Sequence, residues 1–183
     1  MRDLSLHLLD LAQNSITAGA SLVTIRMELD DQGLLTMTLK DDGKGMSPEL
    51  LARVTSPFAT TRTTRKVGLG IPLMKENAEK AGGSFSLESE EGRGTTLTAS
   101  MDTHHIDCLP MGDLSGTLLS LMLTNPLRPD FLFEGRTPLG EASFDTREVR
   151  AALGSDIPLN EPAVAEWLKQ ALEEEINPIF GGA

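Results

Sequence analysis

The chain has 183 residues, which corresponds to one domain with room for an appendage. A hydrophobic fraction of 39% and a charged fraction of 23% exclude wholesale disorder, and the one dense apolar stretch, Leu118 to Leu123, is too short to span a bilayer. The formal net charge of −11 disfavours nucleic acid and anionic membranes as partners, because both repel an acidic protein.

Charge and cysteine content also bear on organisation and location. Residues 1–101 carry a net charge of −2 and residues 102–183 carry −9, so a domain boundary is expected near residue 101. The single cysteine, Cys108, leaves no partner for an internal disulfide. Since no secretory leader is recognisable at the start of the sequence, we expect a cytoplasmic protein.

The first predicted element is an amphipathic helix over residues 3–18. Leucines and alanines recur on one side at about 100° per residue, and Gly19 provides the stop. The other side carries a polar stripe, which occupies about one quarter of the helix circumference and consists of His7, Asp10, Asn14 and Thr17.

A hairpin, a short helix and a basic loop are expected next. Segments 22–29 and 34–40 alternate apolar and polar residues around a turn, and the sequence DDGKGM then forms a second turn. A helix over 48–54 has Ser47 as its cap. Residues 55–66 are rich in Thr, Arg and Lys, which is typical of a loop.

Glycines separate the next predicted elements. The sequence predicts a helix over 72–81 and strands over 84–89 and 95–101. Past residue 102 the apolar content predicts a folded α+β segment that packs on the preceding domain, because a disordered acidic tail would lack it. Its expected helices cover 113–124, 146–153 and 162–176, and its expected strands cover 130–135 and 141–144.

Each motif is weak by itself, but their order is specific. A helix with an acid and an Asn four residues later is followed by a DxGxG turn, a basic loop, a GxG at a helix start and a GxGT before the last strand. In this order residues 1–101 resemble the GHKL ATPase family, which includes DNA gyrase, the heat-shock chaperone, histidine-kinase catalytic domains and mismatch-repair ATPases. The resemblance implies the Bergerat fold, an α/β two-layer sandwich with a mixed sheet and its helices on one face, which binds ATP and Mg²⁺.

The first motif of the resemblance implies a metal ligand and a catalytic acid. Asn14 matches the residue that binds Mg²⁺ through its side-chain oxygen, a hard ligand that this ion prefers. Asp10 stands where hydrolysing members carry a Glu that orients the attacking water. Because Asp is one methylene shorter, its carboxylate would fall short of that water, so the resemblance implies ATP binding with slow hydrolysis. The alternative for both residues is a solvated helix face.

The second motif implies recognition of adenine. Asp41 matches the carboxylate that accepts a hydrogen bond from the exocyclic amine, which discriminates against guanine because guanine presents a carbonyl there. Gly43 and Gly45 allow close backbone approach. Thr95 resembles the threonine that supports the same adenine edge through a water, and its alternative is an ordinary strand residue.

Residues 46–70 resemble the lid over the nucleotide. The resemblance suggests Arg62, Arg65 and Lys66 as phosphate contacts, although a basic loop is often simply solvated. Histidine kinases carry a further glycine where Lys66 stands, so the lid geometry is expected to differ. The run Gly68, Leu69 and Gly70 would offer backbone N–H groups and a helix N-terminus to the phosphates.

Other conspicuous residues are interpreted as structural. His7 is expected to be a surface or capping residue, and the alternative is a place at the rim of the site. Trp167 is expected to anchor a C-terminal helix. The adjacent histidines at 104 and 105 point apart and lack a second ligand pair at zinc spacing, so no metal site is expected there.

The resemblance therefore implies a Mg²⁺-dependent ATP-binding protein, either a slow ATPase or an ATP-dependent regulator that acts through a protein partner. One alternative is a kinase that phosphorylates a partner, in the manner of anti-sigma serine kinases or split histidine kinases. Another is a nucleotide-sensing module without turnover. No phosphoacceptor helix of the histidine-kinase type is visible, which disfavours a self-contained histidine kinase. The acidic segment suits a basic partner or serves solubility alone.

Overall fold

One six-stranded mixed sheet organises the fold in this computed structural model, which describes residues 2–56, 69–154 and 156–181. The strands lie in the order β3-β4-β2-β1-β5-β6. β1 and β5 run parallel, and the other neighbouring pairs are antiparallel. The strands are Leu22–Leu29 (β1), Leu34–Asp41 (β2), Phe85–Glu90 (β3), Gly94–Asp102 (β4), Asp130–Thr137 (β5) and Gly140–Asp145 (β6).

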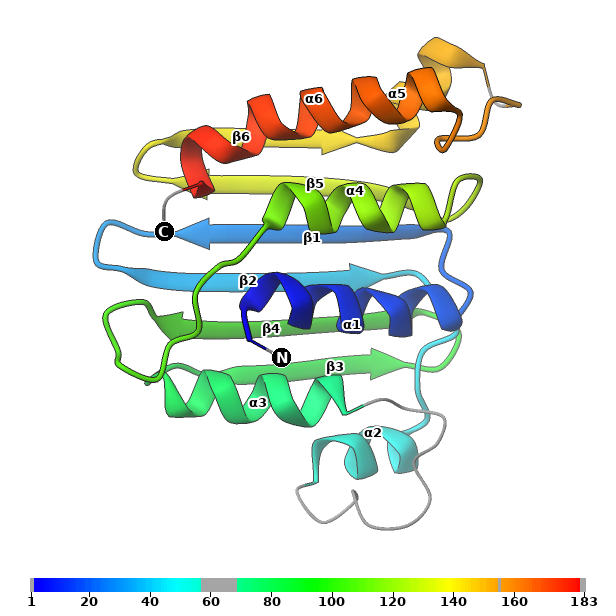
Figure 1. Ribbon diagram of the computed structural model, residues 1–183. Helices are drawn as coiled ribbons and strands as arrows, with labels where there is room; N and C mark the ends of the chain where they lie inside the picture. Colours follow the sequence, from blue (N-terminus) through cyan, green and yellow to red (C-terminus); the bar gives the residue numbers. More distant parts are fainter. Residues whose placement is uncertain (1, 57–68, 155, 182–183) are drawn as a thin grey trace.

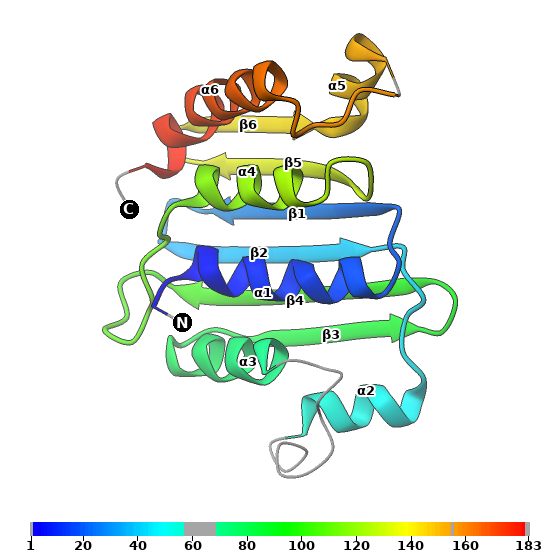
Figure 2. The ribbon, with the colours of Figure 1, turned by 45° about the vertical axis from the view of Figure 1, so that its right-hand side comes forward.

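The helices cover one face of this sheet. Figures 1 and 2 show α1, α3, α4 and α6 side by side across that face, with α2 beyond the β3 edge. The predicted α/β two-layer sandwich with a mixed sheet is confirmed. The helices are Leu4–Thr17 (α1), Gly70–Lys80 (α3), Leu114–Thr124 (α4) and Pro162–Phe180 (α6), together with the shorter Pro48–Thr55 (α2) and Thr146–Leu153 (α5).

α1 forms where its periodicity predicts it. The Asp3 carboxylate caps the helix by accepting the N–H of Leu6 at 2.9 Å, which satisfies one of the free donors of the first turn. Leu8 and Leu11 are buried against the sheet. The polar stripe lies on another flank of the helix, and two of its residues, His7 and Asp10, contact α3.

Residues 102–183 continue the same sheet. β5 lies beside β1, with Leu22 opposite Asp130 at the start of the pairing. Phe131 and Phe133 of β5 are fully buried, and α4 packs between α1 and α6 (Figure 1). The predicted domain boundary at residue 101 stays a prediction. The strands before and after this residue belong to one continuous sheet.

The segment after β4 also holds the beginning of α1. The N–H groups of Leu4 and Ser5 donate to the carbonyl oxygens of Pro110 and Met111 at 2.9 and 3.0 Å. The Ser5 hydroxyl donates to the Met111 carbonyl at 2.6 Å. The first helix is thus anchored by residues that follow position 101.

Three predicted details differ from the structure. α3 begins at Gly70 rather than at residue 72, and α6 continues to Phe180, past the expected end at 176. Trp167 is 52% exposed, and its ring lies 6.4 Å from that of Phe144. The buried leucines and isoleucines of α6 attach this helix more than the tryptophan does.

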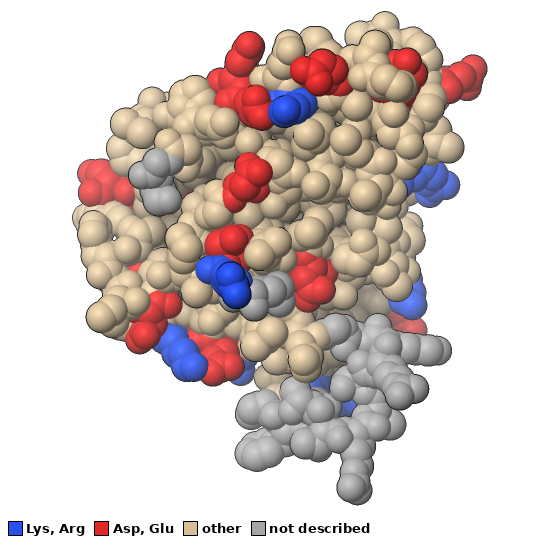
Figure 3. Space-filling view, in the orientation of Figure 1, with Lys and Arg blue, Asp and Glu red and all other residues tan. Residues whose placement is uncertain are grey.

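Among the described helices, none is long and apolar enough to cross a membrane. Figure 3 shows carboxylates at the α6 end of the helix-covered face. The exposed acidic residues of α6 are Glu166, Glu173, Glu174 and Glu175.

Candidate functional site

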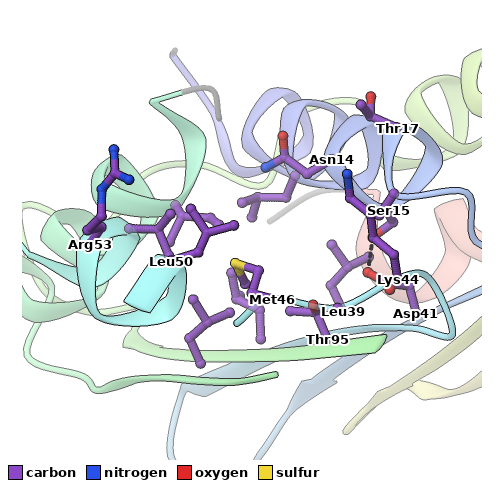
Figure 4. A pocket seen from close by; sticks show the side chains of 17 residues that line it. Asn14, Ser15, Thr17, Leu39, Asp41, Lys44, Met46, Leu50, Arg53 and Thr95 are labelled. Atoms are coloured by element: carbon purple, nitrogen blue, oxygen red, sulfur yellow. Dashed lines mark hydrogen bonds between the residues drawn. The ribbon is translucent and has the colours of Figure 1, made fainter. Parts of the chain in front are cut away.

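A cavity of about 400 Å³ opens between α1, α2 and the start of α3 on one side and strands β2, β4 and β3 on the other. Figure 4 shows its lining side chains. Among the described residues, the polar lining includes Asn14, Ser15, Thr17, Asp41, Lys44, Arg53 and Thr95. The apolar lining includes Leu11, Leu39, Met46, Leu50, Ile71, Leu87 and Leu97. A flat apolar group with a polar edge is the kind of ligand that fits such walls.

Asp41 is the most constrained polar residue of the cavity. It ends β2, is only 7% exposed and accepts two hydrogen bonds. The Ser15 hydroxyl donates to Oδ2 at 2.6 Å (Figure 4), and the Gly43 N–H donates to Oδ1 at 2.9 Å. These donors fix the plane of the carboxylate, and its remaining lone pairs are available to a donor in the cavity.

Thr95 lies directly opposite Asp41 in the β2–β4 pairing. Its Oγ1 is 2.8 Å from the Ser89 hydroxyl, which donates to the Gly94 carbonyl at 3.0 Å. Because a hydroxyl has one proton, the Thr95 hydroxyl must donate to Ser89 in this arrangement. The Thr95 oxygen is then an acceptor beside the Asp41 carboxylate.

Backbone contacts lock the turn that follows β2. The Lys44 N–H donates to the Ala18 carbonyl at 3.0 Å, and the Lys44 carbonyl accepts the Gly92 N–H at 2.7 Å. Gly45 has φ +66°, and a Cβ there would overlap the Glu90 carbonyl oxygen. This position therefore requires glycine, for conformation as well as space.

Asn14 meets the requirement for a ligand-binding amide. Its side chain lines the cavity, and its Nδ2 is buried with no hydrogen-bond partner among the described residues. A buried donor without an acceptor costs free energy, which an acceptor atom of a bound ligand would recover. An amide oxygen is also a hard ligand of the type that suits Mg²⁺.

Asp10 lies one turn before Asn14 but does not line the cavity. Its carboxylate lies against Gly70, the first residue of α3, where a Cβ would overlap Oδ2. The N-cap residue of α3, Leu69, makes no side-chain capping bond. Asp10 therefore places a carboxylate at the positive end of the α3 dipole, where the sequence predicts a phosphate.

The remaining predicted residues divide into two groups. Gly43, Leu69 and Gly70 lie close to the cavity without lining it. The second group lies outside the described part of the chain and consists of Arg62, Arg65, Lys66 and Gly68.

The interpretation of His7 as a surface or capping residue is wrong. Its side chain is buried between α1 and α3, with 2% of the residue exposed, and Nε2 is 2.8 Å from Asn77 Nδ2. Burial lowers the pKa of His7, against the opposing effect of Asp10 and Asp3. The ring is therefore neutral at pH 7.

Sequence reasoning missed several lining residues. Ser15 stands next to Asn14, yet its bond to Asp41 joins residues 26 positions apart, and nothing local signals that pairing. Lys44 lies inside the glycine turn, where a turn residue is the simpler interpretation. Arg53 ends a short amphipathic helix, where it reads as a solvated C-terminal cation.

The part of the chain that lines the cavity is also the part that is similar to known proteins. The profile described as "Histidine kinase-, DNA gyrase B-, and HSP90-like ATPase" matches residues 2–105. The sensor histidine kinase ZraS of Salmonella typhimurium is 33% identical over 93 residues, which are 50% of this chain and 20% of that protein. Sporulation kinase E of Bacillus subtilis is 39% identical over 79 residues, 43% of this chain and 10% of that protein.

Solved structures also match. The catalytic domain of histidine kinase ThkA matches with a TM-score of 0.41 and 24% identity, covering 54% of this chain and 64% of that one. The chain spans one fifth or less of the length of the two curated relatives.

Proposed function

Because the chain belongs to the histidine kinase-, DNA gyrase B- and HSP90-like ATPases, we propose that it binds ATP with Mg²⁺ in the cavity beside Asp41 and acts through a protein partner. The observation that carries the proposal is the double hydrogen bonding of the buried Asp41 carboxylate, which leaves it an oriented acceptor at the wall of an apolar cavity.

The adenine end of the ligand suits the Asp41 side of the cavity. Adenine presents an exocyclic amine, which donates to the carboxylate, and the flat base fits between the surrounding apolar side chains. Thr95 adds an acceptor along the same edge, either directly or through a water. Guanine would set its carbonyl against Asp41, so adenine is favoured.

The phosphate end suits Asn14 and the beginning of α3. The side-chain oxygen of Asn14, which lines the cavity, would hold Mg²⁺, which neutralises phosphate charge when it is bound. The positive end of the α3 dipole and the cation Arg53 favour an anion nearby. Asp10 lies against Gly70 at this end, where its carboxylate is proposed to orient the water that attacks the terminal phosphate.

Two further outcomes compete with slow hydrolysis. The relatives named sensor histidine kinase and sporulation kinase favour phosphoryl transfer to a partner protein. A nucleotide sensor would bind ATP without turnover. Incubation with γ-labelled ATP, alone and with cell lysate, separates the three through free phosphate, a labelled protein or neither.

The acidic surface supports a basic partner. Residues 102–183 carry a net charge of −9, and carboxylates lie along α6 on the helix-covered face (Figure 3). Charge would steer such a partner and salt would screen the attraction. Retention of a partner at low but not at high ionic strength supports this part of the proposal, whereas no retention at low ionic strength contradicts it.

Asp41→Asn is expected to weaken ATP binding by ~1–3 kcal/mol, or about 5- to 150-fold in Kd, because the substitution replaces one acceptor oxygen by a donor. Calorimetric titration with ATP and Mg²⁺ measures the change. Asp42→Asn is the matched control, since Asp42 undergoes the same change of charge but binds the N–H groups of Ser21 and Leu22 outside the cavity. A wild-type protein that binds no ATP, or binds GTP equally well, contradicts the proposal.

Asn14→Ala is expected to abolish the dependence of ATP affinity on Mg²⁺, because the substitution removes the amide that would hold the ion. Titrations with Mg²⁺ and with EDTA should differ by about tenfold in the wild type and coincide in the variant. Gln13→Ala changes the exposed neighbour on the same helix and should behave as wild type. An intact Mg²⁺ effect in Asn14→Ala would assign the metal to another residue.

A further inference from the structure

A buried histidine joins the two helices that border the phosphate end of the cavity. His7 on α1 is 2% exposed, and its Nε2 lies 2.8 Å from Nδ2 of Asn77 in α3. Its other nitrogen, Nδ1, is buried without a hydrogen-bond partner in the described ranges. Only one of the two ring nitrogens is therefore hydrogen-bonded at this contact between the helices.

Stability alone does not account for a histidine at this position. An apolar side chain of similar volume would avoid the desolvated Nδ1 and would still fill the space between the helices. Asn77 is only half-buried, so its amide can reach water if the ring is absent. The protein therefore carries a polar contact that is less stable than an apolar one would be. Such a contact indicates that the relative position of the two helices matters for function.

The position of His7 indicates why that relative position matters. His7 and Asp10 are three residues apart on one flank of α1, and both meet α3. Asp10 lies against Gly70 at the first residue of α3, and His7 binds Asn77 two turns further along the same helix. Two contacts along the axis fix how far α3 can slide or turn relative to α1.

We propose that His7 is a positioning residue, which through Asn77 holds the N-terminus of α3 in register with Asp10 and Asn14 at the phosphate end of the cavity. This inference rests on the proposed function. The neutral ring accepts a hydrogen bond from the Asn77 amide at Nε2, and this directional bond sets a distance and an angle that apolar contact leaves adjustable. A helix displaced by about 1 Å would misplace the groups around a phosphate.

The adenine end does not depend on this contact. Asp41, Ser15 and Thr95 are held by one another, by β2 and β4 and by the glycine turns, and none of their hydrogen bonds involves α3. Loss of the His7–Asn77 bond should therefore weaken binding of the triphosphate and spare binding of the nucleoside. A purely structural role would weaken both ligands together or lower the melting temperature.

The test compares ATP with adenosine in the full chain carrying His7→Leu or His7→Gln. Leu fills a similar volume without a hydrogen bond, whereas the Gln side-chain oxygen reaches the place of Nε2 and accepts the same bond. His7→Leu should raise the Kd for ATP about tenfold, leave the Kd for adenosine within about twofold and keep or raise the melting temperature. His7→Gln should retain the ATP affinity of the wild type.

Asn77→Ala supplies a second route to the same answer, because alanine suits a helix and the position is half-buried. It should show the same selective loss for ATP. An unchanged ratio of ATP to adenosine affinity in Asn77→Ala, or in a folded His7→Leu, overturns the inference while leaving the proposed function intact. A wild-type chain that binds neither ligand overturns the proposed function, and this inference with it.

Discussion

Removal of residues 103–183 is expected to unfold the remaining chain rather than to release a stable ATP-binding domain. β1 would lose its partner β5 and become a sheet edge. α1 would lose α4 beside it and the carbonyl groups of Pro110 and Met111 at its first turn. Burial of Phe131 and Phe133 alone contributes about 1.5–3 kcal/mol each, against a total stability of ~5–15 kcal/mol for a typical domain.

Circular dichroism during heating measures this expectation. The fragment 1–102 should show no cooperative transition, whereas the full chain should. Separately produced fragment 103–183, mixed with the first, is the control, because recovery of a cooperative transition would prove that the missing contacts caused the loss. A fragment 1–102 that melts cooperatively and binds ATP would show that the C-terminal segment is an independent appendage.

Gly94→Ala is expected to destabilise the fold by ~3 kcal/mol or more. Gly94 has φ +103°, and a Cβ there would overlap the Asp41 carbonyl and approach the Asp42 Cα at 3.0 Å. Both obstacles are backbone atoms, at the last residue of β2 and the residue after it, so neither can move aside as a flexible side chain would. The strain of an L-residue at this φ adds to the steric overlap.

Gly92→Ala is the matched control for this prediction. Gly92 has φ +82°, and a Cβ there would meet nothing within 4 Å, so only the conformational cost of about 1–2 kcal/mol remains. Urea unfolding of the two variants separates steric overlap from conformational strain. Equal midpoints for the two variants would show that the Asp41 carbonyl is not a rigid obstacle.

The sequence predicts local structure well because local structure depends on near neighbours. The alternation of 22–29 and 34–40 and the capping of α2 by Ser47 depend on adjacent residues, and the structure contains each of them. The positions of Asp41 and Asn14 at one cavity also follow from motif order, although their roles stay predictions.

Long-range contacts are what sequence reasoning misses. The burial of His7 depends on α3 lying over it, and helical periodicity cannot distinguish a face covered by another helix from a face in water. The place of β5 beside β1 joins partners 108 residues apart, as in the Arg26–Glu134 pair. A propensity or a turn signal carries no information about such a partner.

The parallel pairing of β1 with β5 also sets the order in which the strands can pair while the chain is being synthesised. β1 can pair with β2 as soon as the short hairpin has been synthesised. Its other edge stays unpaired until about 100 further residues have been added. At ribosomal elongation rates of about 5–20 residues per second, that wait is roughly 5–20 s. During this interval the nascent chain carries an uncovered strand edge, so aggregation during synthesis should concentrate there and should depend on translation speed.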